Sequence, residues 1–168
     1  MKFMVANRKR AAELTKLESL PKTAIVSITD IGSMSNSFAN NPNILGIHRV
    51  QFNDVEKGEV GAMTVDHAVD ILDFVKQHLD AELILVHCEG GVSRSAGVAA
   101  ALMKIFNGDD MEIFKSPRFC PNMTCYRNVL MAHFDDVQEE ELADKENTNL
   151  KVWRESWGIE EELSCLYM

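Results

Sequence analysis

Residues 82–97 read ELILVHCEGGVSRSAG, and this stretch joins a strand pattern to a helix pattern through a short loop. Its apolar start has the length and branching of a buried strand, and apolar residues recur at helical spacing from Ser95 to Phe106. The connecting loop holds Cys88 and, six residues later, Arg94. Backbone N–H groups at such a helix start converge on an anion, and the same positive field favours a thiolate. The stretch therefore predicts an anion-binding loop that carries a nucleophilic cysteine.

Strand and helix patterns alternate on both sides of this loop. Asn7 and Thr64 are expected to cap two of the helices, and residues 31–42, rich in Ser, Asn and Gly, to make a surface excursion. The alternation predicts an α/β domain with an at least partly parallel sheet that is covered on both faces. Ligands then gather at the carboxyl ends of the strands, where residues 88–94 lie. We expect strands over 2–6, 23–28, 44–52 and 82–87, and helices over 8–17, 64–79, 95–106, 109–115 and 122–134.

The composition is that of an ordinary globular domain. Of the 168 residues, 46% are hydrophobic and 26% are charged, which excludes a fibrous or disordered chain. Apolar runs are far shorter than the ~20 residues that span a bilayer, and the first 20 residues lack the apolar core of a signal peptide. We therefore expect a cytoplasmic protein with no membrane partner.

The net charge of −9 is unevenly distributed. Residues 135–168 contain 11 acidic and 3 basic side chains, whereas residues 1–134 are nearly neutral. Because the chain has no basic stripe, we expect no nucleic-acid partner. We predict a catalytic domain over 1–134, followed over 135–168 by an acidic connector and a C-terminal helix docked on the same domain. A partner-binding or dimerising role for that helix is the alternative, and the oligomeric state is left open.

Four cysteines, at positions 88, 120, 125 and 165, are expected to be free thiols because the chain has no secretory signal. Cys120 and Cys125 lack a second cysteine or histidine pair at ligand spacing. We therefore predict neither a metal site nor a cofactor.

The loop carries the groups that phosphate-ester chemistry through a cysteine requires. Arg94 can give two parallel hydrogen bonds to a phosphoryl group, and Ser95 is placed to hydrogen-bond the sulfur. Gly90 and Gly91 are expected to allow positive φ in a turn around the anion. The structural alternative is a small buried Cys88 beside a solvated Arg94. The conjunction of these groups favours an active site, whose phosphate-binding residues would be Glu89, Gly90, Gly91, Val92, Ser93 and Arg94.

The pattern His87-Cys88-x-x-Gly91-x-x-Arg94-Ser95 resembles the signature of the cysteine-dependent protein tyrosine phosphatase superfamily, in its compact dual-specificity-like branch. The resemblance spans about residues 2–134. It implies a central, mostly parallel sheet flanked by helices and a metal-free mechanism with a phosphocysteine intermediate. It also implies a general-acid aspartate some thirty residues before the cysteine, and a histidine that orients the loop and favours the thiolate, here His87.

The general acid must lie on a loop at the same sheet edge as the thiolate, and Asp54 and Asp30 both follow strands, with Glu56 nearby. The resemblance favours Asp54, which precedes Cys88 by 34 residues, and Val50-Gln51-Phe52-Asn53-Asp54 is similar to the family's acid loop. Cys120-Pro121-Asn122 is similar to the Pro-Asn step that opens a late helix in the family, which makes Asn122 a supporting residue.

The residues thus predict a phosphomonoester hydrolase, and the resemblance makes it a protein phosphatase of tyrosine or dual specificity. Glu89 either binds a loop backbone group or an arginine, or is solvated. Its negative charge, in a loop without lysine, disfavours a polyanionic substrate and favours a phosphorylated protein. The alternatives are a non-catalytic module that binds phosphorylated residues and a rhodanese-like sulfurtransferase.

Overall fold

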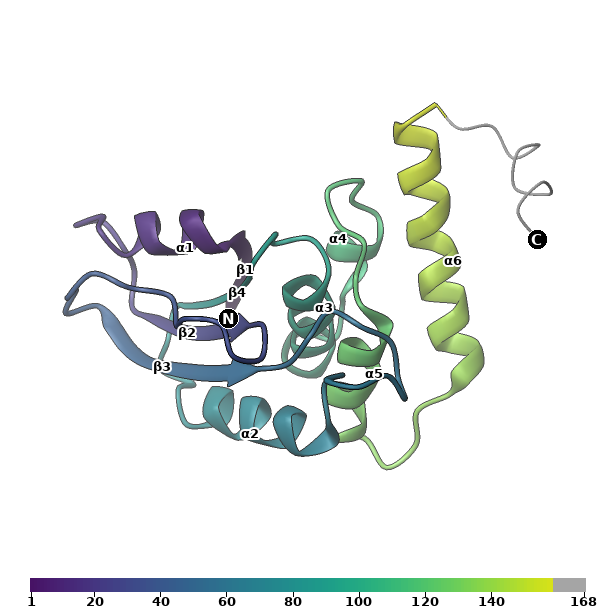
Figure 1. Cartoon of the computed structure of the whole chain (residues 1–168), viewed down its shortest axis with the longest axis horizontal. Helices are drawn as coiled ribbons and strands as arrows, with labels where there is room; N and C mark the ends of the chain where they lie inside the picture. The colour runs from purple at the N-terminus through teal and green to yellow at the C-terminus, as the bar shows by residue number, and fades with distance from the viewer. Residues whose placement is uncertain (159–168) are drawn as a thin grey trace.

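The computed structural model describes residues 1–158, and within them the four strands form one entirely parallel sheet in the order β1-β4-β2-β3 (Figure 1). Every residue of the two central strands is buried, as expected of parallel strands with both faces covered. The strands are β1 (Lys2–Asn7), β2 (Thr23–Thr29), β3 (Ile44–Gln51) and β4 (Leu83–Cys88). The predicted α/β class with a parallel sheet flanked by helices is therefore confirmed.

Helices cover both faces of the sheet (Figure 1). On one face α1 packs through Ala11 and Leu14 against Ile25 and Leu85 of the central strands. The main core lies on the other face, where α2, α3 and α5 pack together with the sheet. The helices are α1 (Arg8–Leu14), α2 (Val65–Lys76), α3 (Arg94–Asn107), α4 (Met111–Phe114), α5 (Met123–Met131) and α6 (Glu139–Ser156).

The predicted caps are confirmed: Asn7 Oδ1 accepts the Arg10 N–H at 2.7 Å, and Thr64 forms a capping box with His67. The first helix ends at Leu14, not at Leu17 as the sequence predicted. The next turn uses tight i→i−3 bonds, and the Thr15 hydroxyl donates to Ala12 while accepting the Ala39 N–H. Thr15 thus holds the loop after β2 instead of continuing the helix.

Residues 31–42 are not simply the surface excursion that their composition predicted. Asn36 is buried, and the Phe38 ring packs edge-on against the His87 ring with centroids 5.7 Å apart. The segment therefore supports the end of β4 from one side. Its polar composition gave no sign of this because the contacts lie far away in sequence.

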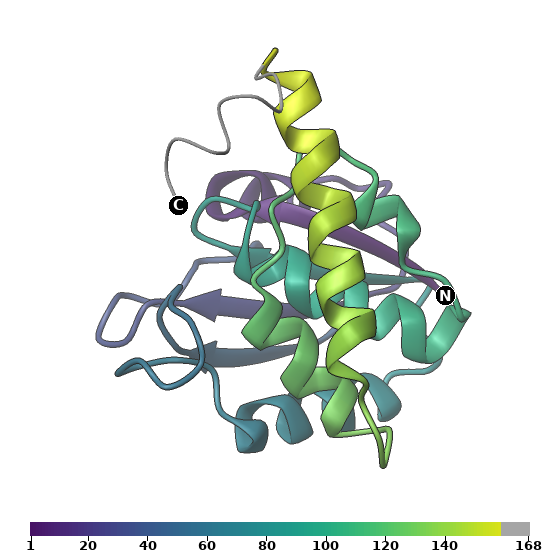
Figure 2. The ribbon, with the colours of Figure 1, turned by 90° about the vertical axis from the view of Figure 1, so that its right-hand side faces the viewer.

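Helix α6 lies across α4 and α5, and its C-terminal part extends past them (Figures 1 and 2). Leu142 and Asn149 are its buried residues, and Asn149 Nδ2 donates to the carbonyls of Phe114 (3.2 Å) and Phe119 (2.9 Å). The side chain of Lys145 pairs with the buried Asp110. A functional division at residue 134 stays a prediction, and Cys165 lies outside the described residues. No helix within 1–158 has the length and apolar character needed to cross a membrane.

Candidate active site

The loop between β4 and α3 sits at the carboxyl edge of the sheet, against the end of β1. Gly91 has φ +66°, and a Cβ there would lie 2.5 Å from the backbone nitrogen of Asn7 and 2.8 Å from the carbonyl oxygen of Ala6. Only glycine fits because both the conformation and the space exclude a side chain. Gly90 differs from the prediction, since its φ is not positive and a Cβ added there would meet no atom within 4 Å. The turn thus depends on one glycine, not two.

The sulfur of Cys88 lies at the base of this loop, and the residue is only 2% exposed. Its Sγ lies 3.0 Å from the Ser95 hydroxyl oxygen and accepts the Gly91 N–H at 3.3 Å. Helix α3 begins at Arg94, so its N-terminal positive end lies close to the sulfur. The Gly91 N–H and the positive end of α3 therefore both lie beside the sulfur.

Arg94 is buried, and its guanidinium is held from one side. Nη1 donates to Asp30 Oδ1 at 2.6 Å and to the Phe52 carbonyl at 2.8 Å. Nε is also buried but has no hydrogen-bond partner among the described residues. A buried donor without an acceptor is costly, and an oxyanion bound in the loop would supply the acceptor.

Asp54 follows β3 and lies against the loop between β4 and α3. Its Oδ1 accepts hydrogen bonds from the Ser93 hydroxyl at 2.8 Å and from Asn122 Nδ2 at 3.0 Å. Asn122 Nδ2 also donates to the Val55 carbonyl at 3.2 Å. The carboxylate is exposed to solvent and fixed by two neutral donors, so a substrate can reach it.

Asn122 joins three parts of the site. Its Oδ1 caps α5 by accepting the Cys125 N–H at 3.0 Å, and its own backbone N–H donates to the Ser93 carbonyl at 3.0 Å. Gly97 makes this approach possible, because a Cβ there would lie 2.4 Å from the Asn122 carbonyl oxygen. The start of α5 is therefore pressed against the start of α3, which positions the amide that holds Asp54.

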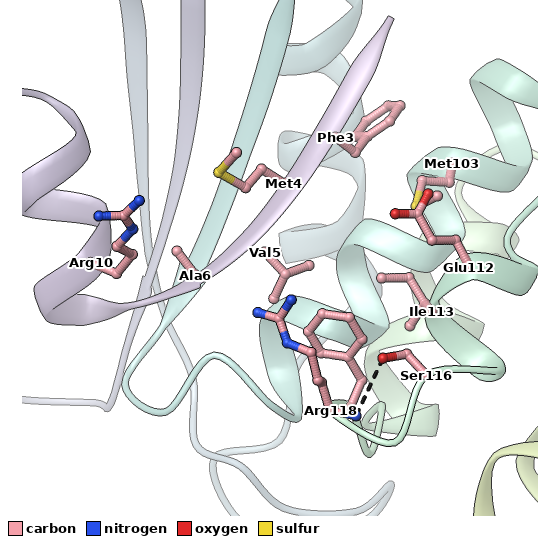
Figure 3. Close-up of a pocket in the computed structure, with 11 residues that line it drawn as sticks. Phe3, Met4, Val5, Ala6, Arg10, Met103, Glu112, Ile113, Ser116 and Arg118 are labelled. Atoms are coloured by element: carbon pink, nitrogen blue, oxygen red, sulfur yellow. Dashed lines mark hydrogen bonds between the residues drawn. The ribbon is translucent and has the colours of Figure 1, made fainter. Parts of the chain in front are cut away.

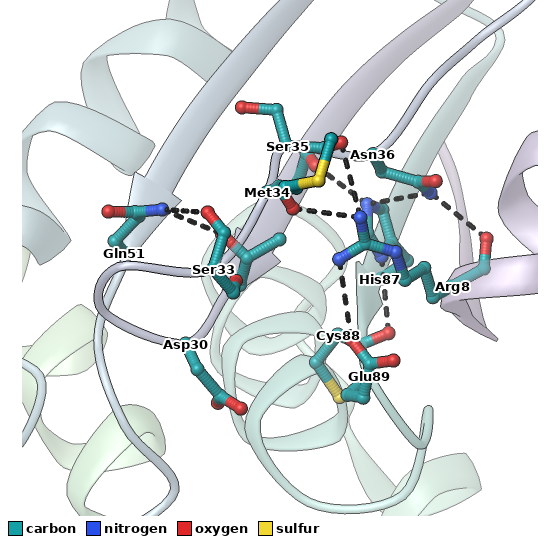
Figure 4. A network of polar contacts seen from close by, with 12 residues as sticks. Arg8, Asp30, Ser33, Met34, Ser35, Asn36, Gln51, His87, Cys88 and Glu89 are labelled. Atoms are coloured by element: carbon teal, nitrogen blue, oxygen red, sulfur yellow. Dashed lines mark hydrogen bonds and ion pairs between the residues drawn. The ribbon is translucent and has the colours of Figure 1, made fainter.

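His87 is fully buried behind the loop and supports it. Nδ1 lies 3.2 Å from the Cys88 carbonyl, which can only accept, so Nδ1 carries the proton. Nε2 then accepts from the Ser27 hydroxyl at 2.7 Å. It also accepts from Asn36 Nδ2 at 3.4 Å, a contact that Figure 4 shows. Burial lowers the pKa of His87, so the ring is neutral and acts as an orienting group.

Arg8 ties the outer side of the loop to the segment after β2. Its guanidinium pairs with Glu89 at 3.5 Å and donates to the carbonyls of Met34 (2.8 Å) and Ser35 (3.1 Å), as Figure 4 shows. The Arg8 backbone N–H also donates to the Glu89 carbonyl at 3.2 Å. Of the options considered for Glu89, the structure contains the arginine pair.

Val92 joins the loop to the segment before α5. Its carbonyl accepts the Cys120 N–H at 3.0 Å, and the residue is 40% exposed. Burial raises the pKa of Cys120 and of Cys125, so both thiols stay protonated near neutral pH. Within residues 1–158 there is no cluster of three or more His, Cys, Asp or Glu side chains that could hold a metal.

The structure thus brings together Cys88, Arg94, Ser95, Asp54 and Asn122, which the sequence had singled out from three separate segments. It adds two features that sequence reasoning missed: the Asp30 carboxylate on Arg94, and the polar support of His87. The sequence analysis considered Asp30 only as a general acid, and its position directly after a strand was the one feature that could have indicated the contact with Arg94. The polar support of His87 was indicated by a serine, Ser27, inside the apolar run 23–28, whereas no feature of the sequence indicated Asn36.

No protein-family model matches the sequence, and no curated protein matches it either. Solved structures do match. A human tyrosine phosphatase-like serine/threonine/tyrosine-interacting protein superposes with a TM-score of 0.57 at 16% identity, covering 77% of this chain and 89% of its own. A mouse putative dual specificity phosphatase complexed with zinc tungstate superposes with a TM-score of 0.54 at 17% identity, covering 83% of this chain and 86% of its own. The chain therefore has the fold of the compact dual-specificity-like phosphatases.

Proposed function

We propose that this chain is a phosphomonoester hydrolase that acts on phosphorylated proteins through a phosphocysteine at Cys88. The observation that carries the proposal is the arrangement of Arg94: Nη1 is bound to the protein while the buried Nε has no acceptor among the described residues. With the sulfur of Cys88 in the same loop, the groups match a phosphoryl oxygen and a nucleophile for its phosphorus.

In the first step the Cys88 thiolate attacks phosphorus and the bond to the leaving oxygen breaks. Arg94 and the loop amides hold the three non-bridging oxygens as negative charge is redistributed. Asp54 begins the step protonated and gives its proton to the leaving oxygen, which departs as an alcohol or phenol. The products of this step are the phosphocysteine and an Asp54 carboxylate.

In the second step water attacks the phosphocysteine and the S–P bond breaks. The Asp54 carboxylate takes the proton of the water, which restores the acid for the next cycle. The Ser95 hydroxyl, 3.0 Å from the sulfur, stabilises the departing thiolate by donating a hydrogen bond. Inorganic phosphate and the starting thiolate are the products, and no cofactor takes part in either step.

The charge of the loop supports a protein substrate over a polyanionic one. Glu89 stands at the loop rim with its side chain 58% exposed, and the loop has no lysine to bind further phosphates. The fold supports tyrosine or dual specificity through its neighbours. A cytoplasmic location stays a prediction from the sequence.

A binding module without turnover is the second candidate, and one specific observation favours it. One fold neighbour is named as a phosphatase-like interacting protein, so the fold is compatible with binding as well as hydrolysis. The presence of nucleophile, arginine and acid together favours hydrolysis here. A rhodanese-like sulfurtransferase would need neither Asp54 nor Ser95.

The test is hydrolysis of an aryl phosphate by wild type, Cys88→Ser and Asp54→Asn. Cys88→Ser should abolish turnover yet still bind vanadate, because the loop donors remain. Asp54→Asn should lose most activity on substrates with poor leaving groups. Cys120→Ser, a free cysteine outside the loop, is the matched control and should retain wild-type turnover. Wild-type binding without turnover would favour the module, and thiosulfate sulfurtransfer that survives Asp54→Ala would favour the sulfurtransferase.

A further inference from the structure

A groove follows the outer edge of β1 and leads to the catalytic loop. It consists of a cavity of about 410 Å³ (Figure 3) and a second of about 280 Å³. The two share five lining residues, and the second is also lined by Gly90, Gly91 and Val92 of the catalytic loop. The shared residues are Val5, Ala6, Arg10, Arg118 and Phe119. A ligand in the groove would therefore run from the part of the loop formed by Gly90, Gly91 and Val92 along β1.

The backbone of β1 is open along this groove. β1 pairs only with β4 within residues 1–158, so its outer edge is unpaired there. The Lys2 N–H points to β4, where it donates to the Glu82 carbonyl at 3.2 Å. Because backbone groups alternate along a strand, those of Phe3 and Val5 point to the open edge. An extended peptide could pair with them as an added strand.

The lining changes from basic to apolar with distance from the catalytic loop. Arg10 on α1 and Arg118 in the segment before α5 flank the end nearest the loop, and both are exposed. Neither forms an ion pair with a carboxylate of the described chain, and Arg118 lies over the Phe119 ring at 5.4 Å. Phe3, Met103 and Ile113 line the far part, together with Glu112. The end of the groove next to the loop is therefore positively charged, on a chain with net charge −9.

We propose that this groove binds the part of the protein substrate next to the phosphorylated residue, as an extended strand along β1. Acidic side chains close to the phosphorylated residue pair with Arg10 and Arg118, and an apolar side chain further along enters the part lined by Phe3 and Ile113. This assignment deepens the proposed function and rests on it. The groove is lined by residues of the catalytic loop, which places its occupant next to the phosphorylated residue. Arg10 and Arg118 favour an occupant with acidic side chains at that end.

The experiment compares kcat/KM for three phosphopeptides whose flanks near the phosphorylated residue are acidic, neutral or basic. The wild type should prefer the acidic over the neutral peptide by about tenfold, as two exposed ion pairs allow. N-methylation of alternate peptide bonds in the flank should remove this preference, because it removes main-chain donors. Equal kcat/KM for the three peptides would overturn the proposal.

The double variant Arg10→Glu/Arg118→Glu should reverse the preference and favour the basic peptide. Helix α1 tolerates Glu at position 10, which is the N3 position of its capped first turn. Lys16→Glu, an exposed charge reversal beyond the end of α1, is the matched control and should keep the acidic preference. If the double variant behaved like Lys16→Glu, the groove would not be the binding surface.

Hydrolysis of a small aryl phosphate separates the two proposals, since this substrate has no flank. The wild type and the double variant should hydrolyse it equally. If the wild type did not hydrolyse the aryl phosphate, the proposed phosphatase activity would be refuted. If it hydrolysed the aryl phosphate but showed no preference among the three peptides, only the proposed role of the groove would be refuted. A concentration-dependent dimer that disappears in the double variant would identify a second copy as the occupant instead.

Discussion

Replacing Asp30 separates two roles that a carboxylate at this site could have. In the structure Asp30 accepts from Nη1 of Arg94, whereas Asp54 accepts from the Ser93 hydroxyl of the loop and from the amide of Asn122. We infer that Asp30 is a positioning residue, which turns the guanidinium so that its remaining donors face the phosphoryl group. Asp30→Ala should therefore lower kcat for aryl phosphates, and by the same factor for good and poor leaving groups.

The size of the effect follows from the contact. A charge-assisted hydrogen bond contributes about 1.5–3 kcal/mol, but the Asp30 side chain is 53% exposed and solvent screens it. About 1.4 kcal/mol remains, which corresponds to a roughly tenfold loss in kcat. Asp30→Asn keeps an oxygen acceptor for Nη1 and should recover most of the rate. Asp30→Asn removes a negative charge beside the anion site but keeps the contact, so it should bind vanadate at least as tightly as the wild type, whereas Asp30→Ala, which releases the guanidinium, should bind it more weakly.

The assay is steady-state hydrolysis of a series of aryl phosphates with leaving groups of increasing pKa, with vanadate inhibition measured alongside. Asp54→Asn is the comparison, and its loss should grow as the leaving group becomes poorer. If the Asp30 variants showed that growing loss instead, Asp30 would be the general acid and not a positioning residue. A wild-type kcat for Asp30→Ala would likewise refute a positioning role.

Three further changes probe the supports of the site. Gly91→Ala should lower the free energy of unfolding in urea by about 1–3 kcal/mol, because position 91 has a positive φ and an added Cβ would clash with backbone. Gly90→Ala should change the free energy of unfolding by less than about 0.5 kcal/mol, and equal effects of the two variants would contradict the dependence of the turn on Gly91 alone. Asn122→Asp keeps the Oδ1 helix cap but turns a carboxylate oxygen toward Asp54 and the Val55 carbonyl, so kcat should fall and the fold should lose about 1–3 kcal/mol in urea unfolding. An unchanged kcat would mean that this amide does not position Asp54. Burial lowers the pKa of His87 from 6.5, so the unfolded chain binds its proton at higher pH than the folded one, and stability falls as the pH drops below about 6.5. His87→Gln should reduce that slope by up to ~1.4 kcal/mol per pH unit, and an unchanged slope would show that the histidine is not buried in its neutral form.

Local patterns in the sequence were enough to predict the elements of this fold. Strand β4 and helix α3 follow from an apolar run and a helical repeat on either side of a loop, and Asn7 and Thr64 marked two helix starts correctly. Such signals are local because a cap or a periodic face depends on residues within a few positions. The parallel sheet followed from the alternation of the elements. The same local signals could not show that the first helix stops at Leu14, since a loop bond to Thr15 ends it.

The sequence alone determined which residues could do the proposed chemistry, because Cys88, Arg94 and Ser95 lie within eight residues, on one loop and the first turn of the helix after it, and this spacing fixes their mutual positions. The structure alone decided what Asp30, Arg8 and Asn36 do, since the partners that define their roles lie between 26 and 81 residues away. Contacts at such separations depend on strand order and on how helices pack, and neither leaves a periodic trace in the chain. The groove along β1 is of the same kind. It exists because β1 lies at the edge of the sheet, and the end of β1 lies beside the loop of residues 88–94.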